Sequence, residues 1–312
     1  MHAPVRSARL QHLLAVVLAV WFAFLAVSYH RSFPAGTLPG HARSLLLALL
    51  ILGSAAGLGA PLAERLAGAS KASYATALLA LGAGLGILEL ATLALIAAGL
   101  ANPVSGWLLV GAGAMAGGRR LASRVDASLG SLPEALVAMR DEVRACWWAL
   151  PVLTLACAGW LAALGAALAP AEFYDALNYH LAAPDRFLAQ GGAGAVPGNF
   201  YSLLPANQGM LYALGMLLSA GRIEAGTLAQ VLHLLLGLLA VAATFIAGRS
   251  HLSPGVGILA AGLLATVPGV LLSATWPIAD LAVTFHAALV LMLLVEARAE
   301  EGRSRGGKVL LA

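Results

Sequence analysis

Long apolar stretches recur along the whole chain and constrain its fold more than any other feature. Of the 312 residues, 61% are hydrophobic and only 10% are charged, whereas about a quarter of the residues are charged in a typical soluble domain. A bilayer core about 30 Å thick is spanned by roughly 20 apolar residues in a helix. The sequence therefore predicts an all-α fold, a polytopic transmembrane helical bundle whose main partner is the lipid bilayer.

The apolar stretches give the order of the expected helices. They lie approximately at 10–29, 44–62, 75–100, 103–117, 145–169, 204–220, 226–248, 254–273 and 277–297. The first follows Arg6 and Arg9 without a small-residue cleavage site, so we expect an uncleaved crossing. Lys308 to Ala312 is typical of the start of another helix, which indicates a chain that stops early.

Basic residues predict the orientation of the helices. The segment 118–144 contains five arginines, so the positive-inside rule places it in the cytoplasm as a basic loop. About four N-terminal transmembrane helices then occupy 1–117, and a transmembrane core occupies 145–312. The long polar loop 170–205 falls on the extracytoplasmic face, and we expect a bacterial inner membrane protein that is active on that face.

The segment 204–220 decides the topology of everything after it. A full crossing there would put Arg249 and the basic residues from Arg298 onward outside, whereas a segment that only dips into the bilayer or lies on its surface would put them inside. The charge rule favours a segment that does not cross. With that choice, Asp280 lies on the same outer side as Asp175.

Several classes of protein and site are excluded by what the sequence lacks. The net charge of +4 and the pI near 9.4 come from basic residues between apolar segments, so we read them as topology signals and expect no nucleic acid. Cys146 and Cys157 have neither a metal spacing nor the pattern of a disulfide framework.

Glycines spaced by four at Gly53/Gly57, Gly82/Gly86 and Gly113/Gly117 allow close helix contacts, although chance spacing is at least as good an explanation.

Within the long loop, the stretch from Tyr174 to Gln190 has the pattern of an amphipathic helix. At about 100° per residue its two faces separate. The apolar face contains Leu177, Leu181, Pro184 and Leu188, and the polar face contains Asp175, Tyr179 and Arg186. A helix of this kind lies in the membrane interface, and Pro184 is expected to kink it or to end its first part.

Asp175 is the candidate catalytic base. A carboxylate held against a membrane cavity can accept a proton from a hydroxyl group, because desolvation raises its basicity. The alternative is that Asp175 caps the helix. His180, at about 140° from Asp175, could bind phosphate or hold an acceptor, or could be an interfacial histidine without a special task.

Other ionisable residues also allow two interpretations. Arg186 and Arg222 could neutralise a phosphate leaving group, or could anchor the protein at the interface. Asp280 opens an apolar run, where an acid could cap the helix or act in the site. Glu89, His233 and His286 lie within apolar segments and are interpreted as helix-contact residues.

Several sequence motifs together resemble a known family. They are FYDALNYHLAAPDRFLAQGG, NFYSLLPANQGMLYALGML, VLHLLLGLLA and TVPGVLLSATWPIADLAVTFHAAL. They resemble bacterial C-type (GT-C) glycosyltransferases, and more closely the family 39-like branch of protein mannosyltransferases and aminoarabinose transferases. In that family the large outer loop carries an essential acid, which Asp175 matches, and a later outer aspartate is matched by Asp280. The paired prolines and the lysine that often follow the loop are missing around Pro205.

The resemblance implies an inverting glycosyltransferase. The donor would be a polyprenyl-phosphate sugar lipid, and the acceptor a hydroxyl of an envelope glycan, lipid or protein. Asp175 and Asp280 would be catalytic, while Tyr179, His180, Arg186 and Arg222 would bind substrate. The family varies in its use of a divalent metal, and no metal site is inferred from Asp175 and His180 alone. A transporter or flippase, or a non-catalytic scaffold, remains the alternative.

Overall fold

The computed structural model describes residues 13–21, 24, 38–66, 74–203 and 206–309. Within these ranges every regular element is helical and no strand occurs. The prediction of an all-α fold is therefore confirmed. Half of the predicted crossing at 10–29 lies outside the described residues.

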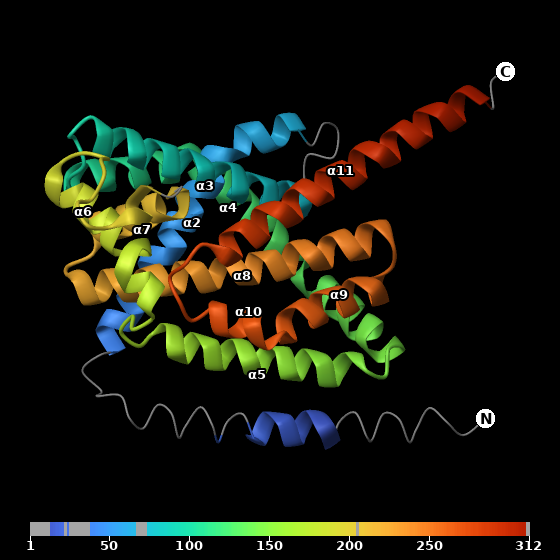
Figure 1. Cartoon of the computed structure of the whole chain (residues 1–312). Coiled ribbons are helices and arrows are strands. Elements are labelled where there is room, and N and C mark those ends of the chain that lie inside the picture. The colour runs from blue at the N-terminus through green and yellow to red at the C-terminus, as the bar shows by residue number, and fades with distance from the viewer. Residues whose placement is uncertain (1–12, 22–23, 25–37, 67–73, 204–205, 310–312) are drawn as a thin grey trace, which may run out of the picture.

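The helices form one bundle (Figure 1), and a π-helix, a short α-helix and a 3-10 helix lie within the long loop. The long and intermediate helices are α2 (Leu38–Leu66), α3 (Tyr74–Ala97), α4 (Pro103–Ala145), α5 (Ala149–Ala167), α6 (Ala182–Gln190), α7 (Asn207–Leu218), α8 (Arg222–His251), α9 (Pro254–Thr266), α10 (Pro268–Ser273) and α11 (Asp280–Val309). The short elements are the π-helix η2 (Ala176–His180) and the 3-10 helix η3 (Phe200–Leu203).

Five of the described helices are long and apolar enough to cross a membrane. They are α2, α3, α5, α8 and the Asp280–Arg298 part of α11, and two shorter apolar stretches, Pro103–Gly117 and Pro254–Thr266, accompany them. Only 28% to 50% of each candidate window is buried inside the bundle. The outward faces expose large apolar side chains such as Leu46, Leu90 and Val283. This surface suits lipid, and the chain is a multi-pass membrane protein.

Different polar contacts join the helices at the two ends of the bundle. At the loop end, defined here as the end that carries residues 170–206, the Gln230 amide donates to the carbonyls of Ala167 and Ala169 at 2.8 and 2.6 Å. At the opposite, basic end, Arg249 of α8 forms an ion pair of 2.8 Å with Glu142 of α4. The loop end lies at the left of Figure 1.

The helix α7 does not cross the bundle. Its 12 residues reach about 18 Å, short of a membrane core. It begins directly after the long loop, and the carbonyl of Leu218 in its last turn accepts a hydrogen bond of 3.4 Å from Arg43 at the start of α2. Both ends therefore lie at the loop end, and α7 (Asn207–Leu218) packs against the other helices without spanning the bundle. This arrangement places Asp175 and Asp280 at the same end.

Three sequence predictions differ from the structure. The segment 118–144, expected as a loop, forms the second half of α4, because its alanines, leucines and arginines favour a continuous helix. The expected helix 254–273 is broken at Pro268, which has no N–H to donate. The segment from Lys308, expected to open a new helix, begins inside the last turn of α11.

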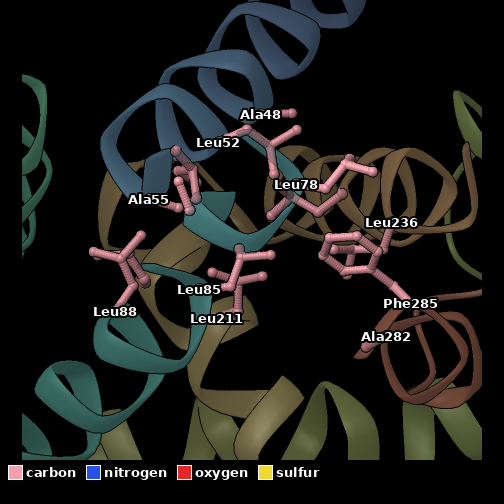
Figure 2. Packing of buried hydrophobic residues seen from close by; sticks show 14 of the residues in the cluster. Ala48, Leu52, Ala55, Leu78, Leu85, Leu88, Leu211, Leu236, Ala282 and Phe285 are labelled. Carbon is pink, nitrogen blue, oxygen red and sulfur yellow. The ribbon is translucent and has the colours of Figure 1, made fainter. Parts of the chain in front are cut away.

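The main core joins the N-terminal helices to the rest of the chain. Figure 2 shows Ala48, Leu52 and Ala55 of α2, Leu78, Leu85 and Leu88 of α3, Leu211 of α7, Leu236 of α8, and Ala282 and Phe285 of α11 in one cluster. The cluster thus contains residues from both 1–117 and 145–312. These two predicted regions pack as one unit.

Close approach of helix backbones explains several of the glycines. A Cβ on Gly117 of α4 would lie 2.5 Å from the Cα of Gly57 on α2, and one on Gly84 of α3 would lie 2.8 Å from the Cα of Ala55. A Cβ on Gly53 or Gly86 would meet nothing within 4 Å. In the pairs Gly53/Gly57 and Gly82/Gly86, close packing therefore requires no more than one of the two glycines. The spacing in the sequence could not reveal this difference.

Candidate functional site

An aromatic stack joins the long loop to the segment that precedes α11. The rings of Phe173 and Trp276 are nearly parallel, at 6°, with centroids 3.8 Å apart. Asp175 follows two residues after Phe173, and Asp280 follows four residues after Trp276. The stack thereby brings two aspartates that are far apart in sequence to one place at the loop end.

Asp175 stands at the start of η2, but its side chain makes no capping hydrogen bond. The backbone N–H of Leu181 donates to the carbonyl of Ala176 at 2.8 Å, which is the i to i+5 bond of a π-helix. Each residue of a π-helix rotates the chain about the helix axis by a smaller angle than a residue of an α-helix does. The π-turn therefore brings His180 to the side of Asp175, where a regular helix would have left the two side chains about 140° apart.

Tyr179 connects the members of the site. Its ring lies 4.3 Å from that of His180 and stacks at 4.8 Å on that of Tyr201. Partial burial raises the pKa of Tyr179, and the charge and hydrogen bonding of Asp175 raise it further. The phenol therefore stays protonated at neutral pH and is available to donate to the Asp175 carboxylate.

The amide of Asn199 fixes Tyr201 against Tyr179. Its nitrogen donates to the carbonyl of Asn178 in η2 at 2.7 Å, and its oxygen accepts from the backbone N–H of Tyr201 at 3.1 Å. One side chain thus ties η3 to η2. Sequence reasoning assigned no role to Asn199 or Tyr201, and neither residue has a local pattern that would reveal one.

Burial lowers the pKa of His180, and the negative charges of Asp175 and Asp280 act against this shift. His180 is half-buried, and a neutral imidazole is therefore its main form at neutral pH. A neutral histidine can donate or accept one hydrogen bond at each ring nitrogen. It does not supply a permanent positive charge.

Two buried side chains hydrogen-bond to the backbone on either side of Asp280. Nε2 of His233 accepts the backbone N–H of Leu281 at 3.1 Å, so Nδ1 carries the proton and donates to the carbonyl of Ser273 at 3.1 Å. The hydroxyl of Tyr212 donates to the carbonyl of Ile278. The interpretation of His233 as a helix-contact residue is confirmed, whereas the role of Tyr212 was missed.

The arginines lie elsewhere at the loop end. Arg222 forms an ion pair of 3.1 Å with Asp185 of α6, and its side chain is 86% exposed. It borders two cavities of about 520 and 530 Å³, both lined mainly by apolar side chains. Arg186 is exposed and belongs neither to the residues around Asp175 nor to the ion pair of Arg222.

The structure thus unites four of the six predicted site residues. Asp175, Tyr179, His180 and Asp280 act on one another electrostatically, while Arg222 belongs to a neighbouring site. Among the described residues no group of three or more His, Cys, Asp or Glu side chains is placed to hold a metal ion.

Comparisons of the chain with known protein families, with curated proteins and with solved structures find no match. The fold and the site therefore define the class alone. The chain is an all-α, multi-pass membrane protein with a group of polar side chains at one end of its bundle.

Proposed function

We propose that the protein is a membrane glycosyltransferase that transfers a sugar from a polyprenyl-phosphate donor to an acceptor hydroxyl on the extracytoplasmic face of a bacterial inner membrane. The observation that carries this proposal is the meeting of Asp175 and Asp280 with Tyr179 and His180 at the loop end. Two carboxylates beside hydrogen-bonding side chains suit the binding and deprotonation of a hydroxyl. The sequence resemblance supports the same activity.

In the proposed step the acceptor oxygen forms a bond to the anomeric carbon while the bond from that carbon to the phosphate oxygen breaks. Asp175 takes the acceptor proton, and the lipid phosphate leaves with the electron pair. Because the aspartate side chain caps no helix, its carboxylate can take this proton while Tyr179 hydrogen-bonds to it. Asp280 and His180 position the acceptor by hydrogen bonding.

The surroundings of Arg222 suit the docking of a lipid donor. A guanidinium between two mainly apolar cavities matches a phosphate head with an apolar tail. Its ion pair with Asp185 is exposed and therefore weak, so a phosphate can replace it. Arg222 is not among the groups whose charge acts on Tyr179 or His180, and we therefore assign it to donor docking and not to the displacement.

The test is sugar transfer in membranes that contain the full chain, with radiolabelled polyprenyl-phosphate sugars and total-lipid and glycan acceptors. We expect Asp175→Asn to lower transfer by about 100-fold or more, because an amide cannot accept the proton. The matched control is Asp141→Asn, at an exposed position of the basic end, which should retain full transfer.

Undiminished transfer by Asp175→Asn at equal expression would remove Asp175 from the mechanism. Absence of transfer from the wild-type chain with every donor would contradict the proposal. That result would favour a transporter or flippase, or a non-catalytic scaffold.

A further inference from the structure

The side chain of Gln208, near the start of α7, is buried without a hydrogen-bond partner. The residue is 6% exposed, and neither the oxygen nor the nitrogen of its amide has a partner among the described residues. The amide approaches the hydroxyl of Tyr212, one turn further along α7, without forming a well-aligned bond. A buried amide offers two donors and an acceptor, and leaving all of them unpaired is unfavourable.

A buried acid lies across the helix interface from this amide. Glu89 of α3 is 9% exposed, and its charge acts on the hydroxyl of Tyr212. Its neighbour Leu88 packs in the same cluster as Leu211 of α7 (Figure 2). Glu89 and Gln208 thus both act on Tyr212 inside an apolar interface, and the proposed transfer step gives a role to none of the three side chains.

The hydrogen-bonding capacity of this group is unbalanced. Tyr212 is 0% exposed, and its hydroxyl donates its only proton to the carbonyl of Ile278. In any further hydrogen bond the hydroxyl oxygen can therefore only accept. The Gln208 N–H groups form no direct bond to the acceptors on Tyr212 and Glu89, and a small molecule that both donates and accepts would satisfy these groups together. Water has this property and is the usual filling of a polar internal space.

A cavity at the loop end lies beside the start of α7. Its volume is about 310 Å³, and its lining includes Leu93, one helical turn after Glu89, and Asn207 and Met210, which flank Gln208. Residues four apart share one face of a helix, so Leu93 and Glu89 line the same side of α3. Water at the loop end thus comes within about one turn of the buried acid.

The other titratable groups that act on this site come from α11. They are His286, which interacts electrostatically with Glu89, and Asp280, which acts on Tyr212. The parts of α2 and α8 that pack here contribute apolar side chains such as Leu52, Ala55 and Leu236. An acid in such surroundings changes its charge state only where water can deliver or remove a proton.

We propose that Glu89, Gln208 and Tyr212 form an internal hydrated site, in which the amide and the phenol hold water beside the Glu89 carboxyl and this carboxyl exchanges one proton with that water. On release, the proton passes from the carboxyl to water and leaves a carboxylate; uptake is the reverse. The water exchanges with the loop end through the cavity beside Asn207. This site is independent of the proposed sugar transfer.

Hydroxyl-radical footprinting of the full chain in lipid nanodiscs tests the water. Radicals form where water is held, so we expect Tyr212 to be oxidised several-fold faster than Phe285, an aromatic residue that is equally buried at 0% exposure but lies in the apolar core. Gln208→Leu, of similar size but without the amide, should lower the Tyr212 rate to that of Phe285. Equal rates in the wild-type chain, or a Tyr212 rate unchanged by Gln208→Leu, would overturn the proposal.

Labelling with dicyclohexylcarbodiimide, an apolar reagent for protonated carboxyls, tests the proton. We expect an adduct on Glu89 that decreases as pH rises, and none on the exposed Asp141. Glu89→Gln should abolish the adduct and leave the oxidation of Tyr212 in place, which also shows that the variant is folded. The absence of an adduct at every pH, or a yield that does not change with pH, would contradict proton exchange. Neither readout depends on transferase activity.

Discussion

At the scale of residues, the site depends on one change of helical register. The π-turn of η2 brings His180 to Asp175, and the stack of Phe173 on Trp276 brings Asp280 to both. Single π-turns within helices occur frequently at functional sites. The negative charges of the two aspartates then raise the pKa of His180, whereas the burial of His180 lowers it.

This balance predicts how His180 titrates in a variant. Asp175→Asn should lower the pKa of His180 further below its ordinary value, because the lost carboxylate favoured the charged imidazolium. Nuclear magnetic resonance of the histidine-labelled chain measures this pKa directly. Asp141→Asn, at the basic end, should leave the titration unchanged, and a rise of the His180 pKa in Asp175→Asn would contradict the assigned proximity.

At the scale of elements, backbone contact determines how α2 packs with α3 and α4. Small residues let membrane helices approach closely, because no side chain separates the two backbones. Gly84 faces the backbone of Ala55, whereas Gly86, two residues later in α3, has open space beside it. The two glycines therefore have different structural importance despite their nearly identical sequence surroundings.

A pair of alanine substitutions separates these roles. Gly84→Ala should destabilise the chain by about 1–3 kcal/mol, because its methyl group would enter the Ala55 backbone. Gly86→Ala should be neutral or stabilising by up to about 1 kcal/mol, since alanine favours a helix and nothing lies nearby. Thermal unfolding in detergent gives the comparison. Equal effects of the two substitutions would contradict the close approach of α2 and α3.

At the scale of the whole molecule, the short helix α7 sets the topology. Because α7 begins and ends at the loop end, the long loop and the start of α8 share one side, and Asp280 returns to that side. The same arrangement leaves Arg249 and Glu142 together at the basic end. A crossing at this position would have separated the two aspartates.

Cysteine accessibility tests this topology. In a chain with Cys146 and Cys157 replaced by serine, we expect Ala195→Cys and Ala220→Cys, both at exposed positions, to react with an impermeant maleimide from the same side of sealed vesicles. Asp141→Cys should react only from the other side. Reaction of Ala195→Cys and Ala220→Cys from opposite sides would show that α7 crosses the membrane.

The sequence by itself determined that the protein is an all-α membrane protein and that its long polar loop contains an amphipathic helix. These properties follow from composition and from periodicity over short windows, which depend on local chain geometry. The same reasoning could choose Asp175 and Asp280 as candidates. It could not tell whether Asp175 caps a helix, because a capping carboxylate and a free one have the same neighbours in sequence.

Only the tertiary structure decided which of these groups meet. The π-turn at Leu181, the stack of Phe173 on Trp276, and the burial of the Gln208 amide each depend on packing between segments that are distant in sequence or on a departure from regular helix geometry. Folding likewise pairs Arg222 with Asp185 of α6, a contact that the sequence pattern did not predict. Periodicity describes the faces of one helix, whereas a site is made by the contacts between several.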